Sequence, residues 1–269
     1  MFSKPSGETF ELFNWQHFLC IGICIIAVIV AYKLTKNITQ ENVIKLTRIF
    51  AYALTGLEVV KIIFKLSWGQ LKDLDQWLPL SFCSLFIYAL WMAGFSRGVL
   101  GKTGCAFIMG GCFIGGLAYI IFPVTSLQWF PPYHFISIHS MLFHSAMLYL
   151  ACIYIKTKMM TFDFEAYKYY GTYVALASIA ALGINFGIGG RWGLVPPNIM
   201  VIKVPPLTEE MAAKFPFSIV QSIYYRSEYL YTVCAVFAYL VIPFAISILV
   251  YLLMHKKQQK NKKYNMRGR

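Results

Sequence analysis

The sequence predicts an all-helical, polytopic membrane protein, a bundle of about seven transmembrane helices. Of the 269 residues, 58% are hydrophobic and 13% are charged, whereas a soluble domain carries about 25% charged residues. The apolar residues gather in runs long enough to cross a bilayer, which takes roughly 20 residues per helix. A strongly basic segment directly follows the last of these runs. Lipid is therefore the solvent for much of the surface.

Each apolar run is bounded by residues that favour the end of a span. Tryptophans lie at or near several of the ends, where their amphipathic rings prefer the headgroup region. Pro79 lies in the first turn of the third run, and Pro131 and Pro132 precede the fifth. The predicted spans are residues 15–32, 43–66, 77–95, 103–122, 134–155, 169–188 and 229–254.

The distribution of Lys and Arg predicts the orientation. If the N-terminus lies outside, the cytoplasmic segments hold 16 of these residues and the outer segments hold eight. The positive-inside rule therefore places the N-terminus outside and the C-terminus inside, which requires an odd number of spans and supports seven. We expect one transmembrane domain over residues 1–255 and a basic cytoplasmic tail over residues 256–269, with the chain in the cell membrane.

The formal net charge of +13 does not indicate nucleic acid binding. Seven basic residues lie in the last 14 positions, directly after an apolar span. A basic segment in that place fixes topology and contacts anionic lipid headgroups. The expected partners are therefore membrane phospholipids and no nucleic acid. No cofactor or metal is expected, because the seven cysteines include no CxxC pair of the structural-zinc type. The oligomeric state is left open.

Polar groups inside the predicted spans are the candidates for function, because such groups are costly in lipid. Glu58 lies in the outer half of the second span, and Cys83 lies at a similar depth in the third. His139 lies about 8 Å below the first residue of the fifth span at ~1.5 Å per residue. Asn185 lies near the outer end of the sixth. On this topology the four side chains share one outer layer, which we predict to be the site.

Each of these residues also has a purely structural interpretation. Two lysines follow Glu58 on one helical face, so an internal ion pair or a snorkelling lysine explains it equally well. Cys83 taken alone is more typical of a small packing residue. Asn185 is placed to cap a broken helix beside several glycines. His139 favours function, because an imidazole inside a span needs a partner.

The longest connection, residues 189–228, faces outward on this topology and is rich in proline and mixed charge. A loop of this length is either functional or disordered. Thr208 predicts the start of a short interfacial helix over residues 207–215.

Several short motifs stand out along the chain. They are Glu58 in the second span, Leu78-Pro79-Leu80-Ser81-Phe82-Cys83-Ser84-Leu85, Phe122-Pro123, Tyr133-His134-Phe135 with His139, and Asn185-Phe186-Gly187. With these motifs the chain resembles the YwaF family of bacterial integral membrane proteins, which is grouped with the eukaryotic transmembrane protein 164 family. The resemblance implies a bacterial cytoplasmic membrane as the location.

The resemblance implies a membrane acyltransferase that remodels phospholipids through a cysteine acyl-enzyme, with a histidine in support. By resemblance, Cys83 is the nucleophile and His139 is the supporting histidine. The chain departs from the family at Ser81, where the bacterial pattern often has a histidine close to the cysteine. This departure bears on how the Cys83 thiol is activated.

In such a mechanism an imidazole deprotonates the thiol, which attacks a phospholipid ester and forms a thioester. Asn185, or a backbone N–H near Pro79, would stabilise the oxyanion, while Glu58 would orient His139 or bind a headgroup ammonium. A lipid hydrolase is the close variant. Two other classes stay open: a transporter or channel with Glu58 and His139 as a proton relay, and a non-enzymatic protein that binds lipids or partners.

Overall fold

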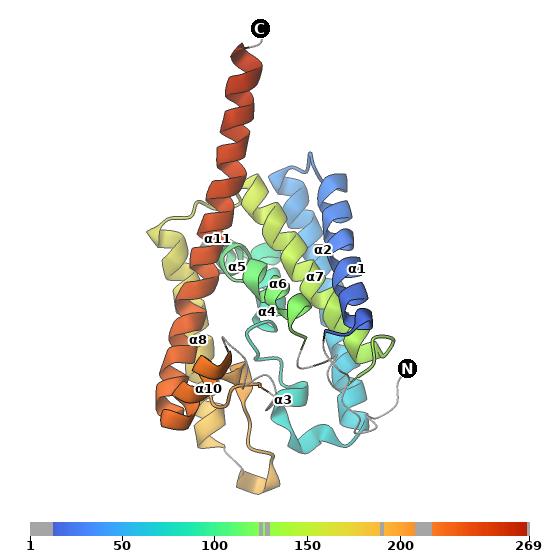
Figure 1. The fold of residues 1–269 in the computed structure, drawn as a ribbon, viewed down its shortest axis with the longest axis vertical. Helices are drawn as coiled ribbons and strands as arrows, with labels where there is room; N and C mark the ends of the chain where they lie inside the picture. The colour runs from blue at the N-terminus through green and yellow to red at the C-terminus, as the bar shows by residue number, and fades with distance from the viewer. Residues whose placement is uncertain (1–12, 124–125, 127–129, 189–190, 208–216, 268–269) are drawn as a thin grey trace.

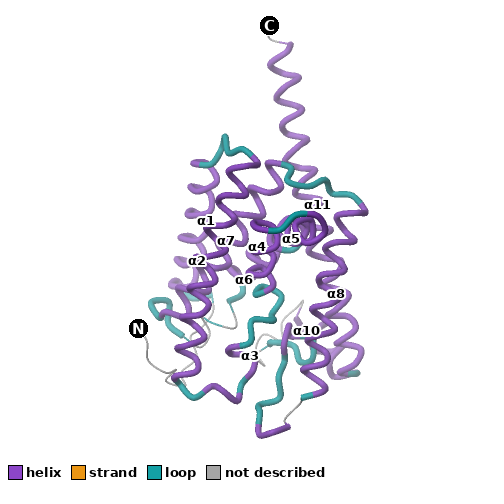
Figure 2. Tube along the Cα trace, turned by 180° about the vertical axis from the view of Figure 1, so that it is seen from behind, coloured by secondary structure: helices purple, strands orange, loops and turns teal. Residues whose placement is uncertain are grey.

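The computed structural model describes residues 13–123, 126, 130–188, 191–207 and 217–267, with side chains described as far as residue 256. Within these ranges every regular element is a helix and there is no strand. The helices stand side by side as a bundle, and the last helix extends well beyond the others at one end (Figures 1 and 2). The predicted interfacial helix over 207–215 lies almost entirely outside the described residues.

Five long helices and five shorter ones make up the described part of the bundle, together with three short 3-10 turns. The long helices are α1 (Trp15–Leu34), α2 (Gln40–Ser67), α7 (Phe135–Thr157), α8 (Phe164–Gly187) and α11 (Glu228–Arg267). The shorter ones are α3 (Leu74–Trp77), α4 (Leu85–Phe95), α5 (Gly98–Gly110), α6 (Cys112–Ile121) and α10 (Phe217–Arg226). The 3-10 turns are η1 (Gln70–Lys72), η2 (Arg191–Gly193) and η3 (Ile199–Val201).

Five segments of the described chain are long and apolar enough to cross a membrane, namely α1, the joined α5 and α6, α7, α8 and most of α11. Helix α4 is apolar but has only 11 residues. Helix α2 has 28 residues, but six of them are charged. The all-helical membrane fold is therefore confirmed, while the count of seven spans and the orientation of the termini stay predictions.

The third predicted span is not one helix. Helix α3 ends at Trp77, Leu78 is extended with φ −85° and ψ 110°, and α4 begins only at Leu85. Pro79 explains the break, because proline donates no backbone hydrogen bond and disfavours the helical conformation of the residue before it. Cys83 consequently lies in an irregular turn just before α4.

Helix α11 continues without interruption from the last predicted span into the basic segment and ends at Arg267 (Figure 1). Lysine and glutamine are good helix formers, and no glycine or proline occurs between Phe244 and Arg267. The predicted boundary at residue 256 therefore coincides with no break in the helix. The contact of the basic side chains with lipid headgroups stays a prediction.

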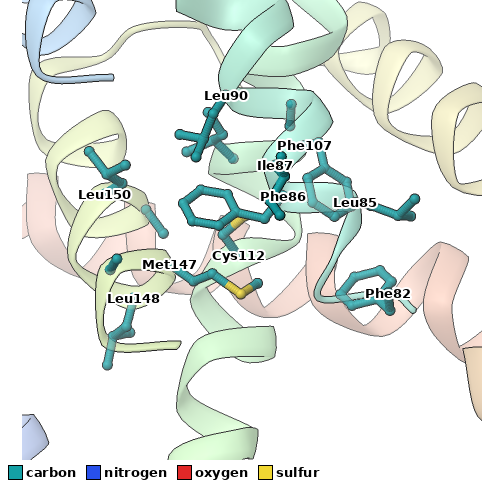
Figure 3. Packing of buried hydrophobic residues seen from close by; sticks show 14 of the residues in the cluster. Phe82, Leu85, Phe86, Ile87, Leu90, Phe107, Cys112, Met147, Leu148 and Leu150 are labelled. Atoms are coloured by element: carbon teal, nitrogen blue, oxygen red, sulfur yellow. The ribbon is translucent and has the colours of Figure 1, made fainter. Parts of the chain in front are cut away.

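The core lies where α4, α5, α6 and α7 meet (Figure 3). Phe86, Phe107 and Cys112 are fully buried there, and the ring of Phe86 makes an edge-to-face contact with Phe143 at 5.7 Å. Helix α6 approaches α7 closely at Gly116, where an added Cβ would lie 2.7 Å from a backbone carbonyl. Close packing of this kind joins helices in membranes.

Candidate functional site

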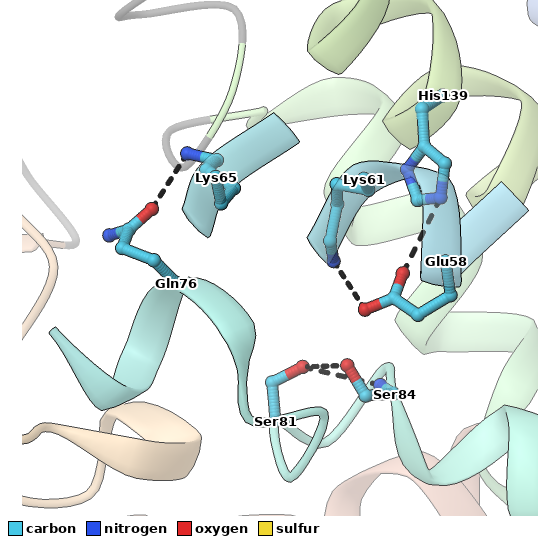
Figure 4. Close-up of polar contacts among 7 residues, drawn as sticks. All are labelled: Glu58, Lys61, Lys65, Gln76, Ser81, Ser84 and His139. Atoms are coloured by element: carbon cyan, nitrogen blue, oxygen red, sulfur yellow. Dashed lines mark hydrogen bonds and ion pairs between the residues drawn. The ribbon is translucent and has the colours of Figure 1, made fainter. Parts of the chain in front are cut away.

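Glu58 on α2 and His139 on α7 lie together inside the bundle (Figure 4). The Nε2 atom of His139 is 3.4 Å from Oε2 of Glu58, and both side chains are buried. The other carboxylate oxygen accepts a hydrogen bond from Lys61 Nζ at 2.5 Å. The predicted internal ion pair of Glu58 is thus confirmed, and so is the expected proximity of Glu58 to His139.

The surroundings of His139 are aromatic. Its ring neighbours those of Phe135 and Phe143, each with its centroid 6.0 Å away. Such apolar walls disfavour charge on the imidazole, so the contact is one between a carboxylate and a neutral ring. Lys61 offsets the charge of Glu58, which a buried carboxylate needs in order to be tolerated. Within the described part of the chain, neither ring nitrogen of His139 makes a hydrogen bond.

His144 belongs to the same buried region, although sequence reasoning gave it no role. Its Nδ1 lies 2.7 Å from the Ser140 carbonyl, which can only accept, so Nδ1 carries the proton. Its ring stacks on Tyr119 at 3.5 Å, and its Nε2 has no described hydrogen-bond partner. The ring of Phe143 contacts both His139 and His144, with centroids 6.0 and 5.4 Å away. The sequence did not indicate this link, because two residues five positions apart are rotated by ~140° from each other around a helix.

Cys83 lies in the turn before α4. It is a free, partly buried thiol, and the described contacts include no hydrogen bond from it to Glu58, His139 or Asn185.

The backbone of the Cys83 turn is shaped by a serine cap. Ser81 Oγ accepts a hydrogen bond from the Ser84 N–H at 3.2 Å and contacts Ser84 Oγ at 2.7 Å (Figure 4). The Leu85 N–H then donates to the Ser81 carbonyl at 3.1 Å and starts α4. The backbone N–H groups of Phe82 and Cys83 make none of the described hydrogen bonds. Two donors are therefore left beside the thiol, at the positive end of α4.

Asn185 is fully buried near the end of α8. Its Nδ2 donates to the Ile199 carbonyl at 3.0 Å, and its Oδ1 accepts from the Ile199 N–H at 2.8 Å. Both ends of the amide are thus engaged by η3 in the connection after α8. The structure brings Glu58 and His139 together, whereas the described hydrogen bonds join Asn185 to a loop and include none from Cys83 to the other three candidates.

This architecture, with five apolar helices of spanning length and ionisable groups buried between helices, defines a polytopic helical membrane protein. The TMEM164 family matches residues 12–223, and the chain belongs to this family. The match includes all four candidate residues but does not single out the YwaF type. No curated protein and no solved structure matches the chain.

Proposed function

We propose that this protein is a cysteine-dependent acyltransferase acting on membrane phospholipids, with Cys83 as its nucleophile. The position of Cys83 carries the proposal: the thiol lies two residues before the first residue of α4, in a turn held by Ser81. The thiol is partly buried, which disfavours a thiolate, so a base must take its proton as it attacks. The family resemblance implies the same residue.

The proposal counts α2 and α4 as spans in addition to the five apolar segments, which makes seven. It places the N-terminus outside and the C-terminus inside a cell membrane. Glu58 and Lys61 on α2 pair with each other inside the bundle, as ionisable groups in a span are expected to do. Irregular backbone is tolerated at membrane depth where protein covers it, and Phe82 and Leu85 beside the turn are buried. The charge distribution supports the orientation.

In the first step the Cys83 thiolate attacks the carbonyl carbon of a phospholipid ester, and the carbonyl π electrons move to oxygen. The N–H groups of Phe82 and Cys83 are placed to stabilise that oxyanion. When the intermediate collapses, the ester C–O bond breaks and the acyl chain stays on sulfur as a thioester. The departing lysophospholipid takes up the proton that the thiol released.

In the second step the hydroxyl of another lysophospholipid attacks the thioester, the C–S bond breaks and the hydroxyl proton returns to sulfur. His139, oriented by Glu58, is the proposed carrier of the proton. Helices α4 and α7 contact each other through Phe86 and Phe143. Phe86 follows Cys83 by three residues, and Phe143 follows His139 by four. Since no direct hydrogen bond joins the thiol and the imidazole, a water or a substrate hydroxyl completes the path.

Mass spectrometry of the purified chain after incubation with phospholipid tests the proposal. We expect an acyl group on Cys83 that hydroxylamine removes, and none after Cys83→Ala. Cys105→Ala is the matched control, because Cys105 is also a free, partly buried thiol. A thioester that survives Cys83→Ala, or none on the unsubstituted chain, contradicts the proposal.

A second candidate function is proton-coupled transport of a small solute. The observation that favours it is the buried group of Glu58, His139 and His144, which makes no described hydrogen bond to Cys83. Under this alternative, Glu58→Gln abolishes proton-coupled flux into proteoliposomes while Cys83→Ala leaves the flux unchanged. The reverse pattern in acyl transfer favours the enzyme.

A further inference from the structure

Residues 195–204, which we call the strap, insert apolar side chains into the end of the bundle. Ile199, Met200 and Ile202 in the strap are 3%, 1% and 0% exposed, and they belong to the same core cluster as Phe82. A loop that buries its backbone in this way needs hydrogen-bond partners for its polar groups. The partners come from elements far apart in the sequence.

Hydrogen bonds to the backbone of the strap tie it to η1, α3, α8 and α11. They run from the Val195 N–H to the Lys72 carbonyl (2.9 Å), from the Asn198 N–H to the Asp75 carboxylate (2.8 and 3.1 Å), between Ile199 and the Asn185 amide (2.8 and 3.0 Å), from the Tyr239 hydroxyl to the Met200 carbonyl (2.9 Å) and from the Tyr231 hydroxyl to the Val201 carbonyl (2.7 Å).

The centre of the strap is conformationally strained. Met200 has φ +59° and Val201 has φ +55°, a left-handed conformation that side chains other than glycine rarely adopt and that is least favourable for a β-branched residue. Strain of this kind persists only where the surrounding structure imposes it. The two strained residues are those whose carbonyls accept the tyrosine hydroxyls. These hydrogen bonds therefore hold the strap in a backbone conformation that its own residues disfavour.

The strap is linked to the Cys83 turn through Tyr239. The ring of Tyr239 stacks on that of Phe82, the residue before Cys83, with centroids 4.8 Å apart. The hydroxyl of the same tyrosine holds the Met200 carbonyl. Tyr239 thus contacts both the turn that bears the thiol and the strap.

We propose that the strap keeps water away from the acyl group on Cys83 and so directs that group to a lipid hydroxyl. The inference rests on the proposed acyl-enzyme. It adds the feature that determines whether a lipid hydroxyl or water accepts the acyl group. A thioester reacts with any hydroxyl that reaches it, and a closed site prevents hydrolysis of such an intermediate. Water attack would break the C–S bond, release a free fatty acid and return a proton to sulfur. Asn185 is then a positioning residue, acting through Ile199.

The test uses the full chain in phospholipid nanodiscs, with a lysophospholipid acceptor and ¹⁸O-labelled water. The readout is the ratio of ¹⁸O-labelled fatty acid to newly acylated phospholipid, which does not depend on how much of the protein is folded. Asn185→Ala removes two hydrogen bonds and should raise the ratio roughly tenfold or more, and Tyr231→Phe removes one and should raise it a few-fold. Tyr229→Phe, an exposed tyrosine on the same helix, should leave it unchanged.

The outcomes separate the two proposals. A thioester in every variant with an unchanged ratio overturns the strap and leaves the proposed function standing. No thioester on the unsubstituted chain overturns the proposed function and the acceptor choice together. Maleimide labelling of a chain that keeps only Cys83 tests water exclusion by itself. We expect Asn185→Ala to speed labelling about tenfold, and equal rates would overturn the strap as a barrier.

Discussion

Two regions of the bundle hold candidate chemistry in different ways. On α2 and α7, Glu58 and His139 meet through side chains that regular helices present to each other, 3.4 Å apart. Around Cys83, an irregular turn and the strap are held by backbone hydrogen bonds and two left-handed residues. The difference teaches that the contact of Glu58 with His139 depends on helix packing, whereas the cysteine site depends on irregular segments, which we expect to open before the helices do.

The largest expected effect concerns the helical region. Lys61→Ala leaves the buried Glu58 carboxylate without its cation, which should lower the free energy of unfolding by about 3–5 kcal/mol. Lys45→Ala on the same helix is the control, because Lys45 and its partner Glu41 are 62% and 77% exposed and such pairs contribute little. Denaturant unfolding in micelles measures both. Equal stability of the two variants would show that the buried Glu58–Lys61 ion pair contributes no more than an exposed one.

Tyr239→Phe should have the next largest effect, now at the cysteine site. The ring still stacks on Phe82, but the Met200 carbonyl loses its donor. An unsatisfied buried carbonyl costs about 1–3 kcal/mol. Hydrogen exchange should then rise in the strap while α2 and α7 keep their protection. A uniform rise across the bundle would contradict the idea that the strap opens separately.

A smaller effect, of opposite sign, is expected for Val201→Gly. Glycine adopts a positive φ readily, so this change should be neutral or stabilise the protein by up to ~1 kcal/mol. Val204→Gly in the same strap is the control: Val204 has no positive φ, so it should lose about 0.5–1 kcal/mol. Thermal unfolding compares them. Equal losses would show that Val201 carries no strain that matters.

The smallest effect concerns pH at the edge of the strap. Partial desolvation of its carboxyl and the neighbouring Asp73 raise the pKa of Asp75 above its ordinary value, although the Asn198 N–H opposes this. A carboxyl whose pKa is higher in the folded state adds stability at low pH, and that stability is lost as pH rises through the folded pKa. Asp75→Asn should remove this dependence from the melting temperature between pH 3 and 7. An unchanged pH profile would show that Asp75 does not titrate in this way.

The extent to which the sequence predicts the site depends on how far apart the contacting residues lie along the chain. Glu58 and Lys61 are three residues apart on one helix, so helical periodicity predicts their pairing. The partners of Asn185 and Tyr239 in the strap lie 14 and 39 residues away, and no periodicity connects them. Asn185 was predicted beside the reacting groups, but its amide holds a loop, and its proposed catalytic role stays a prediction.

The sequence by itself determined the all-helical membrane fold, because long apolar runs must satisfy their backbone hydrogen bonds within one segment when lipid surrounds them. It also singled out the few ionisable groups that such a fold must bury. Only the tertiary structure decided that Glu58 meets His139, that Pro79 places Cys83 in a turn before α4, and that the strap lies against that turn through Tyr239. Contacts between distant segments depend on how helices pack, and packing is a property of the whole chain.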